Sequence, residues 1–187
     1  MTLVLASSSP RRLDLLRQIG IMPGAIFTPD INETPLRDET PRLLAARLAR
    51  AKCDAATHDD AFVLAADTVV GLGSRILPKT GTETEARRCL ALLAGRRHRV
   101  YSAISLRAPD GRIAARNVAS VVGFARLEPA MIDAYIASGE WRGKAGGYAI
   151  QGRAAAFVDF LSGSYSGVVG LPLHETAKLL RGLGWKP

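Results

Sequence analysis

The sequence has few aromatic residues and no long apolar run, and each shortage excludes a class of protein. Phe, Trp and Tyr make up 6% of the 187 residues. Basic and aromatic residues are not interleaved, which argues against a stacking platform for nucleic acid. No apolar run could cross a bilayer, and the first residues lack the basic start and cleavage site of a signal peptide. We expect a cytoplasmic protein with no membrane partner, for which a nucleic-acid partner is disfavoured.

Cysteine and histidine are also scarce. Cys53 and Cys89 lie far apart, both in stretches with helical patterns. They form neither a disulfide framework nor a metal site, so we expect two reduced thiols in the core. His58, His98 and His174 share no spacing typical of a metal site. No Ser-His-Asp order indicates nucleophilic catalysis.

Positive charge and apolar residues are plentiful. The net charge is +8 and 48% of the residues are hydrophobic, enough for a proper core. A positive field attracts anions, and nucleic acid and nucleotide phosphates both fit. Only five of the 25 basic residues are lysines. Three of these, Lys52, Lys79 and Lys144, fall beside the segments discussed below.

Hydrophobic periodicity and turn signals predict a mixture of strands and helices. The expected strands cover residues 2–6, 62–72, a hairpin of 99–108 and 113–127, 156–160 and 166–170. The expected helices cover residues 10–19, 40–56, 82–95, 129–137 and 172–181. Since the order is not a strict βαβ alternation, we predict an α/β domain over residues 1–187, in which helices pack around a mixed, twisted sheet.

The segment Ser7-Ser8-Ser9-Pro10-Arg11-Arg12 joins a predicted strand to the start of a helix. A helix N-terminus presents free backbone N–H groups and the positive end of the helix dipole, and both favour a phosphate. The serine hydroxyls add donors, and arginine binds phosphate oxygens in a forked geometry. The segment therefore suits a phosphate site. The alternative is an ordinary capped helix with two solvated arginines.

Asp67 interrupts the nearly continuous apolar run of residues 62–72, which is typical of a buried strand. A carboxylate there is costly unless it is paired, hydrogen-bonded or bound to a metal. The alternative, that Asp67 opens a turn at a strand end, is disfavoured because the run resumes through Val70. We interpret Asp67 as a carboxylate that holds Mg²⁺ or takes a proton from an attacking water.

Two further segments carry weaker signals. Glu33 lies in a proline-bearing loop and gains a role only if folding brings it near Asp67. In residues 144–152, paired glycines let the backbone approach a ligand and Lys144 offers a positive charge. Gln151 can read an amide-like base edge through one donor and one acceptor. A flexible loop before a strand is the alternative for this segment.

Four segments, in the same order, resemble the Maf family of nucleotide pyrophosphatases over nearly the whole chain: residues 5–12, 66–70, 144–152 and 168–173. The resemblance implies a fold like that of the Maf and inosine-triphosphate pyrophosphatase group, with a bent mixed sheet and two lobes around a nucleotide cleft. It implies hydrolysis between the α and β phosphates of a non-canonical or pyrimidine triphosphate. A divalent cation, Mg²⁺ or Mn²⁺, and a homodimer are also implied.

The same resemblance assigns roles by position. Asp67 would be the general base or a metal-linked carboxylate, and Glu33 a second acid at the metal. The phosphates would be held by Ser8, Arg11, Arg12, Lys52 and Lys79, and Lys144 and Gln151 complete the expected substrate-binding set.

Arg11, Arg12 and Gln151 resemble the dTTP/UTP-type branch of the family. Branches that look specific for 7-methyl-GTP have an acid in place of Gln151, whereas a neutral amide can pair with the O4 and N3–H edge of thymine or uracil. The implied reaction releases monophosphate and pyrophosphate from dTTP or UTP and so cleans the nucleotide pool. Alternatives are a pyrophosphatase for 7-methyl-GTP or another modified purine, a non-catalytic nucleotide-sensing regulator of cell division, and a nucleic-acid-binding module.

Three positions depart from the family pattern. Pro78-Lys79-Thr80 stands where Gly-Lys-Pro is common, and Ser102 stands where threonine is usual. Asn32 precedes Glu33 where an aspartate is frequent. This last change is expected to leave the metal site one carboxylate poorer.

Overall fold

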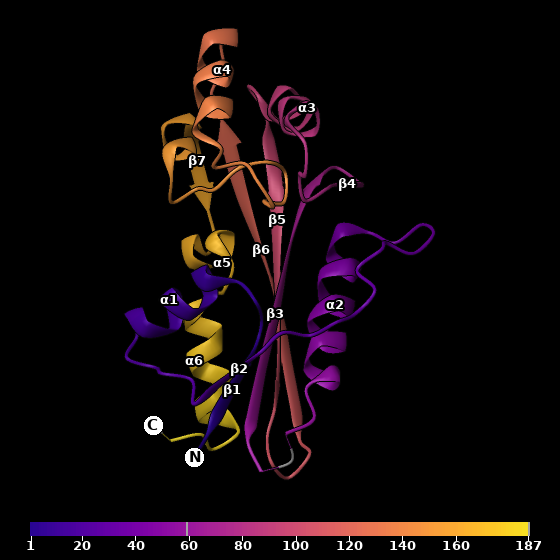
Figure 1. Ribbon diagram of the computed structural model, residues 1–187, viewed down its shortest axis with the longest axis vertical. Helices are drawn as coiled ribbons and strands as arrows, with labels where there is room; N and C mark the ends of the chain where they lie inside the picture. The colour runs from indigo at the N-terminus through magenta and orange to yellow at the C-terminus, as the bar shows by residue number, and fades with distance from the viewer. Residues whose placement is uncertain (59, 187) are drawn as a thin grey trace.

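A seven-stranded mixed sheet forms the centre of the protein in the computed structural model, which describes residues 1–58 and 60–186 (Figure 1). The strand order is β2-β1-β3-β5-β6-β7, with β4 beside β3. β1 pairs in parallel with β2 and β3, and all other pairs are antiparallel. The strands are β1 Leu3–Ala6, β2 Ala25–Phe27, β3 Phe62–Leu72, β4 Arg75–Leu77, β5 Arg97–Arg107, β6 Ile113–Phe124 and β7 Val158–Ser162.

Helices cover the sheet, and local signals fix where several of them begin. Thr40 caps α2 by accepting a hydrogen bond from the Leu43 N–H, and Thr82 forms the expected capping box with Glu85 at α3. No helix in the described ranges is long and apolar enough to span a membrane. The helices are α1 Pro10–Gln18, α2 Pro41–Ala55, α3 Glu83–Leu93, α4 Pro129–Ser138, α5 Tyr165–Val169 and α6 Leu173–Gly182, with a 3₁₀ helix, η1, at Arg153–Phe157.

The long strands β3, β5 and β6 run through two lobes (Figure 1). In the lower lobe of that view, α1 and α6 lie on one side of the sheet and α2 lies on the other. Because side chains alternate along a strand, Phe62 and Leu64 of β3 alternate in direction with Val63 and Ala65. The first pair packs with α1 and α6, and the second pair packs with Cys53 of α2. In the upper lobe, α3 and α4 contact each other beside β4 and β7.

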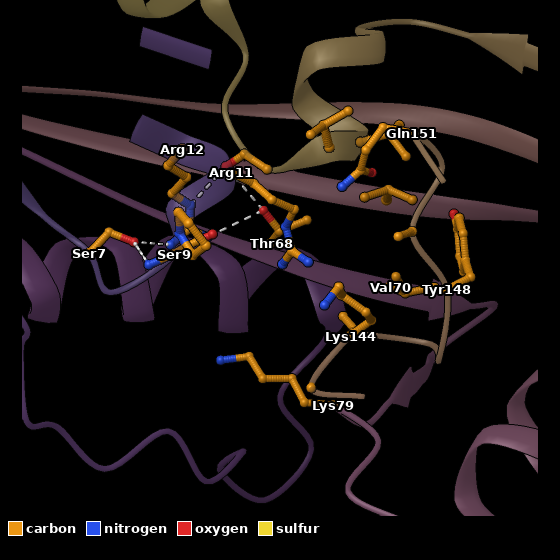
Figure 2. Close-up of a pocket in the computed structure, with 18 of the residues that line it drawn as sticks. Ser7, Ser9, Arg11, Arg12, Thr68, Val70, Lys79, Lys144, Tyr148 and Gln151 are labelled. Atoms are coloured by element: carbon orange, nitrogen blue, oxygen red, sulfur yellow. Dashed lines mark hydrogen bonds between the residues drawn. The ribbon is translucent and has the colours of Figure 1, made fainter. Parts of the chain in front are cut away.

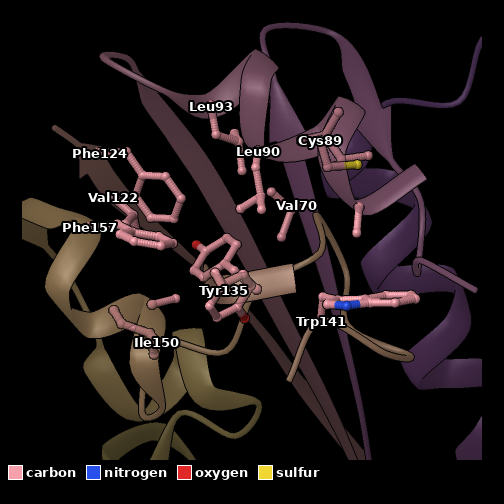
Figure 3. Packing of buried hydrophobic residues seen from close by; sticks show 14 of the residues in the cluster. Val70, Cys89, Leu90, Leu93, Val122, Phe124, Tyr135, Trp141, Ile150 and Phe157 are labelled. Atoms are coloured by element: carbon pink, nitrogen blue, oxygen red, sulfur yellow. The ribbon is translucent and has the colours of Figure 1, made fainter. Parts of the chain in front are cut away.

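Each lobe has its own apolar core. The upper core gathers aromatic rings, with Phe157 between Tyr135 and Phe124 in edge-to-face contacts, and Trp141 fully buried nearby (Figure 3). Cys89 belongs to this core, and Cys53 lies in the lower lobe. Both cysteines are buried and free, as predicted.

Most of the predicted elements are present, but the strand predicted at 166–170 is wrong. These residues fall largely in the helix α5, because the Ser164 hydroxyl accepts a hydrogen bond from the Gly167 N–H at 3.0 Å and caps the turn. The strand predicted at 156–160 begins later, at Val158, because η1 occupies the preceding residues. The short strands β2 and β4, with three residues each, were not predicted.

Candidate active site

A cleft with a volume of about 580 Å³ lies at the junction of the two lobes (Figure 2). Eight of the nine predicted site residues line it, although they come from distant parts of the sequence. They are Ser8, Arg11, Arg12, Glu33, Lys52, Lys79, Lys144 and Gln151. The ninth, Asp67, is 1% exposed and lies behind Lys52.

The cleft opens where one edge of β3 has no neighbouring strand. β1 ends at Ala6, opposite Ala65, and β4 pairs with β3 only from Val70 onward. Between these points, residues 66–69 have no strand partner on this edge in the part of the chain that the structure describes. Loops from both lobes therefore converge on this stretch of β3.

Neighbouring residues of that stretch serve opposite faces of the sheet. Thr68 points toward α1, where its hydroxyl lies 3.5 Å from an Nη of Arg12. Asp67 points toward α2, where its Oδ1 lies 2.6 Å from Nζ of Lys52. The site therefore contains side chains from both faces of the sheet.

The start of α1 offers free donors to the cleft. Ser9 is the N-cap residue, but its side chain makes no capping hydrogen bond within the described ranges. Ser8 beside it is exposed. The Nε of Arg11 is buried and lacks a hydrogen-bond partner among the residues described here, and burial lowers the pKa of its guanidinium. These unsatisfied donors suit an anionic ligand.

Arg12, in contrast, has protein partners for its donors. Its Nε donates to the Gly170 carbonyl at 2.9 Å, and an Nη donates to the Ser7 hydroxyl at 2.8 Å (Figure 2). Burial lowers the pKa of Arg12, while the charges of Asp67 and Glu33 oppose this shift. Arg12 lines the cleft and ties the start of α1 to the loop after α5.

Lys52 joins the two predicted carboxylates. Its ammonium group is 2.6 Å from Oδ1 of Asp67 and 2.5 Å from Oε1 of Glu33. The cost of burying Asp67 is therefore offset by an ion pair, as the sequence required. Oδ2 of Asp67 is buried and accepts no hydrogen bond from the described part of the protein.

Glu33 also contacts Lys79, whose ammonium group bonds Oε2. Burial raises the pKa of Glu33, but the hydrogen bonds from Lys52 and Lys79 outweigh it and lower the pKa to about 2. Glu33 therefore remains ionised at any physiological pH. A role for Glu33 required that folding bring it near Asp67. The structure meets this condition, because both carboxylates bind Lys52.

The segment 144–152 closes the cleft from the upper lobe. Gly146 and Gly147 have φ of +67° and +73°, and a Cβ on Gly146 would lie 3.1 Å from a methyl of Val70. Glycine thus permits both the left-handed turn and the close approach to β3. Burial and the nearby charge of Arg11 lower the pKa of Lys144. The positively charged side chains of Arg11 and Lys144 therefore face the same cleft.

Figure 2 shows Gln151 and Tyr148 at the opposite end of the cleft from Ser7 and Ser9. The Tyr148 hydroxyl is 2.7 Å from Nε2 of the buried His98, and burial lowers the pKa of His98 to about 4. A neutral histidine thus braces this wall. This role of His98 and Tyr148 could not be predicted from the sequence, because the two residues are 50 positions apart and meet only in the folded chain.

Glu140 was not among the predicted site residues. It lines the cleft, and its Oε2 accepts the Arg153 N–H at 2.8 Å. A Cβ on Gly152 would come within 2.1 Å of that oxygen. Glu140 therefore holds the chain directly after Gln151, and a side chain at position 152 would displace its carboxylate.

The described residues contain no cluster of three or more His, Cys, Asp and Glu side chains arranged to hold a metal. Two carboxylates nevertheless face one ammonium group, that of Lys52, and one carboxylate oxygen is without a donor. Mg²⁺ typically binds one or two carboxylates together with substrate phosphates, so Glu33 and Asp67 fit such an ion.

A family model described as Maf-like protein matches residues 2–183. The chain belongs to the Maf family. Many curated relatives of this Maf protein are named dTTP/UTP pyrophosphatase. The one from Maricaulis maris is 62% identical over 98% of this chain and 88% of its own length. The one from Paramagnetospirillum magneticum is 61% identical over 99% and 98%, and the one from Caulobacter vibrioides is 59% identical over 99% and 97%.

A solved structure of a HAM1 protein from Coxiella burnetii is similar to this Maf protein in fold. The TM-score is 0.53 at 18% sequence identity, and the match covers 97% of this chain and 100% of the HAM1 chain. The predicted fold class, a mixed sheet with helices packed around it, is confirmed.

Proposed function

We propose that this protein hydrolyses dTTP and UTP to the monophosphate and pyrophosphate. The observation that carries the proposal is one cleft with cations and helix-terminal donors at one end, an amide and an aromatic wall at the other, and two carboxylates on a shared lysine. The names of relatives at 59–62% identity support the same reaction.

The triphosphate would occupy the basic part of the cleft. Arg11, with its unpartnered Nε, and Lys144, with its lowered pKa, are the cations best placed to gain from an anionic ligand. The Ser8 hydroxyl adds an uncharged donor, and the positive end of the α1 dipole also favours an anion. Lys79 lines the same cleft, where it would stabilise negative charge that develops on the leaving pyrophosphate.

Glu33 and Asp67 would hold the divalent cation, Mg²⁺ or Mn²⁺. When bound, such an ion neutralises phosphate charge and makes the phosphorus more open to attack. Asp67 also supplies the proton acceptor that hydrolysis needs. Its Oδ2 is the carboxylate oxygen without a donor in the described structure, so we assign the proton of the attacking water to that atom.

The base would lie at the far end of the cleft. Gln151 offers an N–H donor to O4 of thymine or uracil and a carbonyl acceptor to N3–H. Tyr148 supplies a flat wall there, held by His98. Pairing with an edge shared by thymine and uracil explains why dTTP and UTP would both be substrates.

We also propose that the enzyme is a cytoplasmic homodimer. Light scattering, which measures the mass of the particle in solution, can test the number of subunits.

The deciding experiment is pyrophosphate release from a panel of dTTP, UTP, CTP, GTP and 7-methyl-GTP with Mg²⁺ or Mn²⁺. Wild type should prefer dTTP and UTP and lose turnover on chelation, and Asp67→Asn should abolish turnover. Asp133→Asn, on the exposed surface of α4, is the matched control and should behave as wild type.

Other outcomes would redirect the proposal. Preference for 7-methyl-GTP would favour the modified-purine alternative. Nucleotide binding without turnover by the wild type would contradict an enzyme and favour a nucleotide-sensing regulator.

A further inference from the structure

The loop that carries Glu33 is fastened to α2 by two charged side chains that play no part in the chemistry above. Arg47 binds Glu39 through two hydrogen bonds, from Nε to Oε1 at 2.7 Å and from an Nη to Oε2 at 2.8 Å. The Glu39 side chain is 7% exposed and that of Arg47 is 30% exposed. A forked, partly buried pair of this kind fixes geometry more firmly than a fully exposed ion pair does.

Both side chains also bind the backbone that follows Glu33. The same Nη of Arg47 donates to the Thr34 carbonyl at 3.0 Å, and Oε2 of Glu39 accepts the Leu36 N–H at 3.0 Å. Thr34 directly follows Glu33. The pair therefore fixes the chain one residue away from the carboxylate that contacts Lys52 and Lys79.

The anchored loop contains a left-handed turn at a residue that is not glycine. Asp38, which directly precedes Glu39, has φ of +59° and is the one non-glycine residue with positive φ in the described chain. Residues other than glycine rarely adopt this region. The hydrogen bonds from Arg47 also lower the pKa of Glu39, so the pair stays charged. The anchor thus holds a turn that the sequence alone would not favour.

The helix α2 then acts on Glu33 at two points. Lys52 binds its carboxylate, and Arg47, five positions earlier on the same helix, binds the backbone that follows it. Movement of the loop relative to α2 would displace the Glu33 carboxylate from Lys52 and Asp67.

We infer that Arg47 and Glu39 are positioning residues that set the place of the Glu33 carboxylate in the active site. The inference rests on the role of Glu33 in the proposed hydrolysis. Arg47 and Glu39 touch no substrate and act only through Glu33. Catalytic groups misplaced by about 1 Å can lose roughly 100-fold in rate, so small shifts of this loop are sufficient to matter.

The test compares Arg47→Met with Arg50→Met in pyrophosphate release from dTTP. Arg50 lies on the same helix and forms an exposed ion pair with Asp54, so its loss should leave the kinetics unchanged. Arg47→Met should lower kcat by about 10- to 100-fold and change KM for dTTP by less than about threefold. Glu39→Gln should lower kcat in the same direction.

A double mutant separates positioning from general damage to the fold. In a Glu33→Gln background, adding Arg47→Met should cause no further loss of kcat, because the residue it positions is already disabled. Losses that multiply would overturn the inference. Arg47→Lys keeps the charge but not the fork, and gives the same test if Arg47→Met yields little folded protein.

The outcomes also separate the inference from the proposed function. If Glu33→Gln leaves kcat unchanged, the role given to Glu33 is wrong. If Glu33→Gln lowers kcat but Arg47→Met does not, the role of Glu33 stands and the positioning role of Arg47 is overturned.

Discussion

Lys52 and Asp67 form a buried ion pair between α2 and β3, with Nζ 2.6 Å from Oδ1. Both side chains are less than one tenth exposed. The attraction in such a pair is largely offset by the loss of hydration, but removal of one partner leaves the other charge buried and uncompensated. The stability of the protein is therefore coupled to residues of the proposed active site.

Lys52→Met should lower the free energy of unfolding by about 3–5 kcal/mol, since it strands the Asp67 carboxylate. The double variant Lys52→Met/Asp67→Asn should recover part of that loss, because the stranded Asp67 carboxylate is gone. Denaturant unfolding measures both. Lys178→Met, an exposed substitution on α6, should change the free energy by less than about 0.5 kcal/mol. Equal loss in the single and double variants would contradict this account.

The charge of Glu33 should stabilise the protein in a defined pH range. Its pKa is lowered from 4.5 to about 2 in the folded protein, so the unfolded chain binds the proton more readily. The stabilisation is fully present above pH 4.5 and is lost as the pH falls toward 2. The difference in unfolding free energy between wild type and Glu33→Gln should therefore be constant above this range and shrink within it. A constant difference across the whole range would show that Glu33 has an ordinary pKa.

Gly152→Ala should distort the end of the cleft at which the base is proposed to bind. The added Cβ would meet Oε2 of Glu140 at 2.1 Å, which forces the carboxylate from the Arg153 N–H. We expect KM for dTTP to rise by about tenfold, a change of about 1.4 kcal/mol. Gly182→Ala, where the structure leaves open space, is the control. Glu140→Ala alone should raise KM in the same direction, because it removes the same hydrogen bond to the Arg153 N–H. A KM for dTTP that stays unchanged in Gly152→Ala would refute the role given to Glu140.

Gln151→Leu should weaken recognition of the base without weakening recognition of phosphate. The variant loses the donor and acceptor proposed to pair with thymine or uracil, so kcat/KM for dTTP and UTP should fall by about tenfold or more. Inhibition by pyrophosphate, which engages only the cationic end, should not change. Gln18→Leu, at the exposed end of α1, controls for the substitution itself. If Gln151→Leu weakens pyrophosphate inhibition as much as it lowers kcat/KM, the proposal that Gln151 binds the base is wrong.

Local patterns predicted local structure well. The apolar run of residues 62–72 is the strand β3 to the residue, and the capping box at Thr82 starts α3. The prediction failed at residues 166–170, where two valines favoured a strand. The cap from Ser164 and the contact of Val168 and Val169 with the upper core stabilise a helix there instead. Tertiary packing overrode a short propensity signal there.

The candidate site was predictable only in part, because its parts meet across long separations. The cost of a charge inside a strand identified Asp67 from the sequence, but its partner Lys52 had no such signal. Glu33 remained ambiguous until the fold brought it to Lys52. The family resemblance supplied these residues where spacing could not. Nothing in the local sequence pointed to the fork between Glu39 and Arg47, which depends on a turn that only the folded chain reveals.

The strands β3, β5 and β6 pass without interruption from the lower core into the upper one. Neither half can swing as a rigid body without shearing an antiparallel hydrogen-bond ladder, so the described residues form no hinge of the kind that separates two independent domains. Admission of a nucleotide must come from twisting of the sheet and from movements of loops at its edge. Because both halves share these strands, the protein should unfold in one cooperative transition. The β3 amides that bond to β5 should exchange as slowly as global unfolding allows.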